Sequence, residues 1–216
     1  DRFRNGDPSN DRVKGMLEDS NRAFQGGRHG GDLAGVIESL EYFKSLGVSS
    51  LWLNPVLEND MPAYSYHGYA MTDLYAVDAR YGSNALYKEL ADKAKEKGIG
   101  LIMDQVANHT GSSHPWMADL PSKDWVNQWP EFTQTNHMKV SRFDPHAAEV
   151  DRKQFTDGWF VETMPDLNQR NEKLARYLIQ KSIWWVEYLG LHGIRMDTWS
   201  YPDKQFLADW TKAILD

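Results

Sequence analysis

The stretch SNALYKELADKAKEKGIGLIMD, residues 83–104, contains the unit that decides the fold. Apolar side chains recur in it at helical spacing, at Leu86, Leu90, Ala91 and Ala94. Ser83 can cap the start of this helix and Gly98 can end it. The apolar run 99–103 follows at once and predicts a short buried strand. The stretch therefore predicts a helix joined to a strand by a tight turn.

The same unit occurs once before this stretch and once after it. Residues 33–46 and 174–188 each predict an amphipathic helix, ended by Gly47 and Gly190. Strands are predicted after them at 50–53 and 193–196. A last helix is predicted to begin at Pro202. Helices that alternate with short strands are typical of βα units and a parallel sheet.

The predicted fold class is α/β, a partial TIM (β/α)8 barrel. A whole barrel takes about 250 residues, so the three strands, with the tail of one before Asp1, suggest the first four βα units. Residues 112–164 are too many for a bare loop and are rich in Trp and Phe, which predicts an inserted subdomain after the third strand. The expected division is 1–111 for the first part of the barrel, 112–164 for the insert, and 165–216 for the continuation of the barrel.

Composition narrows the function classes. The net charge of −7 and the lack of a basic stripe argue against nucleic acid as a partner. No run of 18 apolar residues is present, which argues against a membrane span. Cysteine is absent, which excludes disulfides and Cys-ligated zinc but favours neither the periplasm nor the cytoplasm. The 9 Trp and 10 Tyr include flat apolar rings of the kind that suit sugars. Because the chain starts at Asp1, we expect a processed or excised piece.

Polar side chains stand where two of the predicted strands end. Asp104, Asn108 and His109 follow one strand, while Arg195 and Asp197 are two apart and therefore share a face of the next. Arg beside Asp should lower the carboxylate pKa and keep it ionised, as a covalent nucleophile requires. A buried ion pair that braces the barrel would show the same spacing, and spacing alone leaves both interpretations open.

The N-terminal loop is rich in side-chain oxygens, from Asn5, Asp7, Asn10 and Asp11. The turn Gly30-Gly31-Asp32 can add a carbonyl and a carboxylate. Calcium takes six to eight such oxygens. A network of Asx turns without metal would use the same residues.

Motifs in these regions resemble the α-amylase family of glycoside hydrolases, and most closely its cyclomaltodextrinase and neopullulanase branch. They span nearly the whole chain in the family's order: DRFRNGDPSND (1–11), GGDLAGVIESLEYFKSLGVSSLWLNPV (30–56), YHGY (66–69), DQVANH (104–109), MPDLN (164–168) and GIRMD (193–197).

The resemblance implies a role for each matching residue. Asp197 resembles the nucleophile, and Arg195 the arginine that keeps it charged and oriented. His109 and Tyr69 are similar to residues that contact the sugar, with His67 beside Tyr69. The resemblance also implies that Asp104 holds Arg195, and that Asn108 lies near the site, where amylases often have a calcium ligand. It further implies a calcium-binding set, formed by Asn5, Asp7, Asn10, Asp11, Gly30 and Asp32.

The implied activity is retaining hydrolysis of α-1,4-glucosidic bonds in maltodextrins, cyclomaltodextrins or pullulan. The family's acid/base glutamate is expected beyond Asp216, so the isolated chain is expected to be inactive. Asp166 stands where the cyclomaltodextrinase branch commonly has lysine, which argues against that exact activity. Alternatives are a non-catalytic amylase-like binding or partner domain, and an α-1,6-glucosidase or transglycosylase on the same fold. The branch also suggests a homodimer of the full-length protein.

Overall fold

A computed structural model describes all of residues 1–216. Its three strands are β1 (Ser50–Trp52), β2 (Gly100–Gln105) and β3 (Gly193–Met196), in the sheet order β1-β2-β3. β1 pairs with β2 in parallel, with Leu51 opposite Leu101. The helices are α1 (Leu33–Glu38), α2 (Leu40–Ser45), α3 (Asn84–Glu96), α4 (Lys139–Phe143), α5 (Glu149–Asp157), α6 (Glu172–Leu189) and α7 (Lys204–Leu215), with short 3₁₀ turns η1 (Pro8–Asn10), η2 (Ser65–His67) and η3 (Pro115–Met117).

The chain divides into two compact units. Unit 1 consists of residues 1–105 and 184–195, and unit 2 of residues 106–183 and 196–216. The predicted inserted subdomain, 112–164, is not separated from the rest of unit 2 by this division and stays a prediction. None of the helices is long and apolar enough to cross a lipid bilayer.

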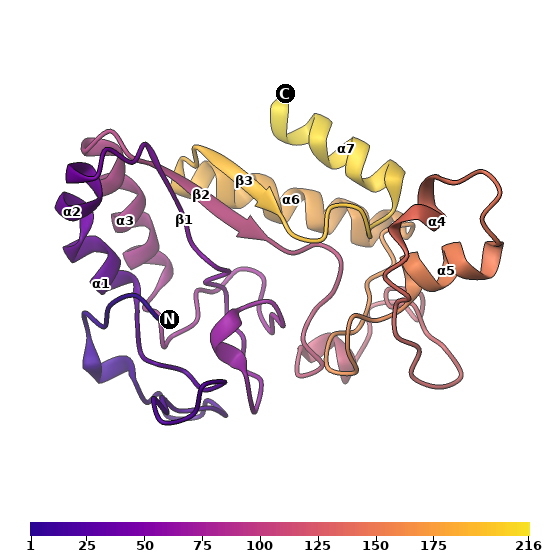
Figure 1. The fold of residues 1–216 in the computed structure, drawn as a ribbon, viewed down its shortest axis with the longest axis horizontal. Helices are drawn as coiled ribbons and strands as arrows, with labels where there is room; N and C mark the ends of the chain where they lie inside the picture. The colour runs from indigo at the N-terminus through magenta and orange to yellow at the C-terminus, as the bar shows by residue number, and fades with distance from the viewer. The chain divides into compact units, whose positions relative to one another are not determined.

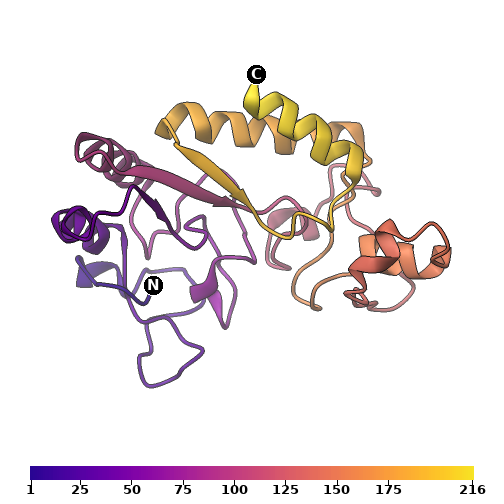
Figure 2. The same ribbon diagram turned by 45° about the horizontal axis from the view of Figure 1, so that its top comes forward.

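Unit 1 contains two of the predicted helix–strand units. In Figures 1 and 2, α1, α2 and α3 lie beside β1 and β2. The side chain of Ser83 accepts the N–H of Leu86 at the start of α3, and Gly98 has φ +75° beyond its end. Both are the predicted caps. The helix packs through the buried side chains Tyr87, Leu90, Ala91 and Ala94. Three of these belong to the predicted apolar stripe, Tyr87 adds to it, and Leu86, the fourth predicted position, is only half-buried.

One predicted helix of unit 1 is two helices. Residues 33–46 form α1 and α2, which meet at Ser39. The hydroxyl of Ser39 donates to the carbonyl of Gly35 at 2.8 Å, and its N–H bonds the carbonyls of Val36 and Ile37. Serine side chains compete with helical hydrogen bonding in this way. Because the apolar periodicity continues through Ser39, it does not reveal the break between the two helices.

Unit 2 contains the long connection after β2. Figure 2 shows α4 and α5 side by side in the orange part of the chain. The last helix, α7, begins at Lys204 and not at the predicted Pro202. The carboxylate of Asp203 accepts the N–H groups of Gln205 and Phe206, which makes Asp203 the N-cap.

Candidate functional site

The carboxylate of Asp104 accepts hydrogen bonds from three side chains in unit 1. Asp104 lies at the end of β2 and is buried. It accepts hydrogen bonds from the Trp52 indole N–H at 3.0 Å and from the Tyr69 hydroxyl at 3.3 Å. Arg195 Nη1 lies 3.0 and 3.1 Å from its two oxygens. Residues from β1, β2, β3 and the loop after β1 are therefore held at one point.

Arg195 lies between two aromatic rings. Its guanidinium carbon is 5.3 Å from the ring centroid of Trp52 and 5.9 Å from that of Tyr69. The arginine side chain is 35% exposed, and Trp52 is 56% exposed. The site therefore presents an exposed aromatic face beside a fixed positive charge, and such faces can stack on apolar sugar faces.

The surroundings of His67 favour its neutral form. Its Nδ1 accepts the backbone N–H of Tyr69 at 2.9 Å, and its ring stacks on the Tyr69 ring at 5.8 Å. Burial lowers the pKa of His67, while Glu18 acts weakly in the other direction. Because Nδ1 is an acceptor, the ring proton sits on Nε2 in this form.

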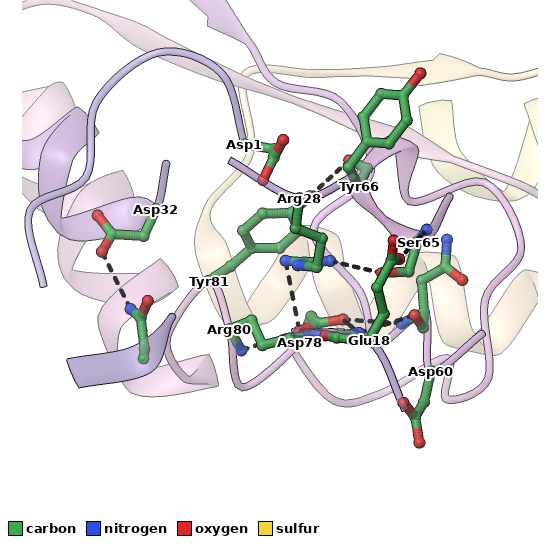
Figure 3. Close-up of polar contacts among 12 residues, drawn as sticks. Asp1, Glu18, Arg28, Asp32, Asp60, Ser65, Tyr66, Asp78, Arg80 and Tyr81 are labelled. Atoms are coloured by element: carbon green, nitrogen blue, oxygen red, sulfur yellow. Dashed lines mark hydrogen bonds and ion pairs between the residues drawn. The ribbon is translucent and has the colours of Figure 1, made fainter. Parts of the chain in front are cut away.

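A buried ion cluster around Asp78, shown in Figure 3, contacts the segment that precedes His67. Arg80 and Arg28 pair with the carboxylate of Asp78 at 2.7 and 3.8 Å, and all three side chains are buried. Arg28 also donates to the hydroxyl of Ser65 at 3.3 Å, and Tyr81 donates to the carbonyl of Tyr66 at 2.8 Å. The cluster thereby fixes η2, which ends at His67.

In unit 2, Asn108, His109 and Asp166 lie together. The Asn108 amide donates to Asp166 at 2.9 Å, and His109 forms an isolated bridge with Asp166. The Asn127 amide donates to the other Asp166 oxygen at 2.8 Å. Burial raises the pKa of Asp166 well above its ordinary value, against these two hydrogen bonds. The Oδ1 atom of Asn108 is buried without a hydrogen-bond partner.

Asp197 also lies in unit 2, directly after β3, and is buried. The residue that follows it, Thr198, has φ +48°. Of the predicted site residues, the structure brings Asp104, Arg195, Tyr69 and His67 together in unit 1. In unit 2 it places the Asn108 amide 3.4 Å from Nδ1 of His109.

The N-terminal loop of unit 1 is organised around Asp32. One carboxylate oxygen accepts the N–H groups of Gly6 and Gly35, at 2.9 and 2.7 Å. The other accepts the N–H of Asp7 at 2.8 Å and the amide of Asn10 at 3.1 Å. Four N–H groups therefore donate hydrogen bonds to this carboxylate, which caps α1 and anchors the loop.

Two oxygens of this loop fit a hard cation. Asn5 donates its amide to Asp11 at 2.8 Å, and the Oδ1 atoms of Asn5 and Asn10 are buried without a hydrogen-bond partner. Gly30, at φ +82°, passes so close that a Cβ there would lie 2.0 Å from an Asp11 oxygen. The Asp7 side chain instead accepts the N–H and hydroxyl of Ser9. No group of three or more His, Cys, Asp or Glu gathers here or elsewhere in the chain. A cation here would thus rely mainly on amide and carbonyl oxygens, with Asp11 as the nearby carboxylate.

Two site residues were not found from the sequence. The sequence predicts Trp52 only as part of a strand, and its direct hydrogen bond to Asp104 depends on the register of β1 and β2. Phe160, whose ring lies 5.4 Å from that of His109, belongs to the long connection, where no periodicity indicates contacts. In the sequence, only the abundance of aromatic residues points to contacts of this kind.

Known proteins resemble this chain along its whole length. Residues 1–211 match the catalytic domain of the α-amylase family. The chain is 34% identical to a β/α-amylase of Paenibacillus polymyxa over 99% of its own length, and 30% identical to neopullulanase 2 of Thermoactinomyces vulgaris, also over 99%. It covers 17% and 35% of those two proteins, so it spans about a third or less of their length.

Solved structures agree with the sequence comparison. An α-amylase from Anoxybacillus aligns with 99% of the chain at a TM-score of 0.84 and 31% identity, and the chain covers 42% of it. An α-amylase from Geobacillus thermoleovorans in complex with acarbose aligns with 94% of the chain at a TM-score of 0.74 and 32% identity, again with 42% covered. The three parallel strands therefore correspond to part of an α-amylase barrel, and the chain belongs to the α-amylase family, matching its catalytic domain.

Proposed function

We propose that the protein carrying this chain hydrolyses α-1,4-glucosidic bonds of maltodextrins, cyclomaltodextrins or pullulan with retention of configuration. The observation that supports it best is the group formed by Asp104, Arg195, Tyr69 and Trp52. This group fixes the guanidinium of Arg195 beside the rings of Trp52 and Tyr69, and Arg195 stands two positions before Asp197 in the sequence. The relatives include proteins named neopullulanase and cyclomaltodextrinase.

In the proposed reaction, a carboxylate oxygen of Asp197 attacks the anomeric carbon. The bond from that carbon to the glycosidic oxygen breaks, and its electron pair stays on the leaving oxygen, which takes a proton from a general acid. Water then attacks the glycosyl-enzyme, losing a proton to the same group, and Asp197 is released. The proposal places that group on a glutamate outside residues 1–216, as the resemblance implies, so the isolated chain would not turn over.

The proposed substrate-binding residues are His67, Tyr69, His109, Asp104 and Asn108, and Arg195 is proposed as a catalytic residue with Asp197. Stacking on Tyr69 would orient the sugar ring. Arg195 would orient the nucleophile, as the resemblance implies. Asp104 would act through Arg195 and Tyr69 by fixing both side chains, since its own oxygens are already occupied by donors.

A calcium ion is the proposed cofactor of the N-terminal loop. The Oδ1 atoms of Asn5 and Asn10, the carboxylate of Asp11 and the carbonyl of Gly30 would hold it. Its contribution would be structural, because it would link segments of the loop that side-chain hydrogen bonds join only in part. We assign Asp32 to anchoring the loop through its four N–H donors, outside the set that holds the ion.

The test is hydrolysis by the protein expressed from its own gene, assayed with maltotriose, cyclomaltodextrin, pullulan and an α-1,6-linked glucan. We expect release of α-configured product from an α-1,4 substrate and loss of turnover in Asp197→Asn. Asp209→Asn, an exposed carboxylate of α7, serves as the control and should keep full activity. Binding of maltotriose without turnover by the unmodified protein would favour the non-catalytic alternative, and turnover of only the α-1,6 glucan would favour the α-1,6-glucosidase.

A further inference from the structure

The turn after Asp197 is held in a backbone conformation that its sequence disfavours. Thr198 has φ +48°, a region that β-branched residues rarely adopt, and its hydroxyl is buried without a hydrogen-bond partner. The turn is closed by the N–H of Tyr201, which donates to the carbonyl of Thr198 at 2.8 Å. Strain of this kind persists only where surrounding contacts over-determine it.

Those contacts come from the long connection between β2 and α6, within the same unit. Arg142 donates from Nη1 to the carbonyl of Tyr201 at 3.0 Å and from Nη2 to the carbonyl of Pro202 at 2.6 Å. The ring of Phe155 stacks on that of Tyr201 at 4.4 Å, and His137 Nδ1 lies 3.0 Å from the Tyr201 hydroxyl. Backbone and side chain of Tyr201 are therefore both fixed.

We propose that Arg142 is a positioning residue, which holds the turn 198–201 and thereby aims the carboxylate of Asp197. The proposal rests on the proposed function in taking Asp197 as the nucleophile. A guanidinium suits the task because its planar fork can donate to two consecutive carbonyls at once, whereas an ammonium is a single point. The long connection would then control the orientation of the nucleophile without touching substrate.

Loss of Arg142 would free the carbonyls of Tyr201 and Pro202 and let Thr198 relax toward negative φ. Because Thr198 directly follows Asp197, this rotation would displace the carboxylate relative to the anomeric carbon. Misplacement of a reacting group by about 1 Å costs on the order of a hundredfold in rate. Residues that bind the sugar would be unaffected, so the change should appear in kcat and not in KM.

The test compares variants in the protein expressed from its own gene. Arg142→Met should lower kcat by about ten- to a hundredfold and leave KM within about twofold. Arg142→Lys should recover only part of the loss. Arg152→Met is the matched control, since Arg152 also donates to two consecutive carbonyls, of Asp144 and Pro145 at 2.7 and 2.8 Å, but away from the turn. It should leave kcat unchanged.

A second substitution can distinguish a lost orientation of Asp197 from a general loss of structure. Glycine adopts positive φ without strain, so Thr198→Gly added to Arg142→Met should restore part of kcat. Unchanged kcat in Arg142→Met, an equal loss in Arg152→Met, or no rescue by Thr198→Gly would each overturn the proposal.

Hydrogen exchange of the Tyr201 amide supplies a readout that does not depend on activity. It should become faster in Arg142→Met and stay unchanged in Arg152→Met. If the unmodified protein hydrolyses no α-glucan, the proposed function fails, while this exchange still decides whether Arg142 holds the turn. Unchanged exchange in Arg142→Met would refute the holding role even in an active enzyme.

Discussion

Arg195, on β3, binds both carboxylate oxygens of Asp104, on β2, through a single guanidinium nitrogen at 3.0 and 3.1 Å. The Asp104 side chain is fully buried, whereas that of Arg195 is 35% exposed. The ion pair thus joins a carboxylate inside the sheet to an arginine that still reaches solvent, and it fixes the arginine two residues before Asp197.

Replacing Asp104 with Asn should cost both stability and turnover. The amide keeps the size of the side chain but removes the negative charge that pairs with Arg195, and we expect a loss of about 2 kcal/mol in the free energy of unfolding. Urea unfolding measures it. Asp92→Asn is the control, because Asp92 forms an exposed pair with Lys88 that should contribute at most about 0.5 kcal/mol. Equal losses in the two variants would show that the buried carboxylate has no special role.

Calcium should stabilise the protein through the N-terminal loop. At a concentration a hundredfold above Kd, a ligand that binds only the folded state adds about 2.7 kcal/mol. We expect added calcium to raise Tm in the chelator-treated protein, and Asn5→Ala or Asn10→Ala to abolish the rise. Asn21→Ala, in the same loop, should keep it, since the Asn21 side chain is occupied by the N–H of Ala23. A calcium response that survives in the Asn5 and Asn10 variants would place the ion elsewhere.

The free energy of unfolding should fall as the pH drops below 6.5 because of His67. Burial lowers its pKa in the folded protein below the ordinary 6.5, so the unfolded chain takes up the proton first. The contribution is complete above pH 6.5 and is lost as the pH falls through the lower folded value. His67→Asn, which keeps an acceptor for the Tyr69 N–H, should remove this part of the pH dependence. His146→Asn, at an exposed position, should leave it in place.

Lys181 should make the free energy of unfolding depend on pH in the alkaline range. It is buried in α6, and burial lowers its pKa from 10.5 to about 7. Between these two values the unfolded chain binds more protons than the folded one, so the free energy of unfolding should rise from pH 7 toward pH 10. Lys181→Met should flatten that rise, measured by chemical unfolding at several pH values. In the control Lys173→Met, at an exposed position of the same helix, the rise should persist.

The sequence predicted what depends on local pattern. The caps of α3 at Ser83 and Gly98 are recognisable because cap residues act within a few positions of themselves. The break at Ser39 was missed because a side-chain bond to the carbonyl of Gly35 competes with the helix without changing the apolar stripe. The start of α7 was placed two residues early because Asp203 is a stronger N-cap signal than the preceding proline.

Only some residues of the candidate site could be predicted from the sequence. The motifs of the α-amylase family identified Arg195 and Asp104, and the structure shows their direct contact. Trp52 lies within one of these motifs but has no role implied by it, and Arg142 lies outside all of them. Their contacts join residues 52 and 59 positions apart in the chain. Such pairings depend on strand register and on the path of long loops, which one sequence does not encode in any short window.

Asp32 makes the N-terminal loop and the first turn of α1 a single cooperative unit. The same carboxylate that accepts the N–H of Gly35 in the helix accepts those of Gly6 and Asp7 in the loop. Opening the loop therefore removes donors from the group that caps the helix, and fraying of the helix weakens the anchor of the loop. Amides of the two segments should exchange with one common opening free energy. An ion bound by the loop would then protect a helix that it never touches.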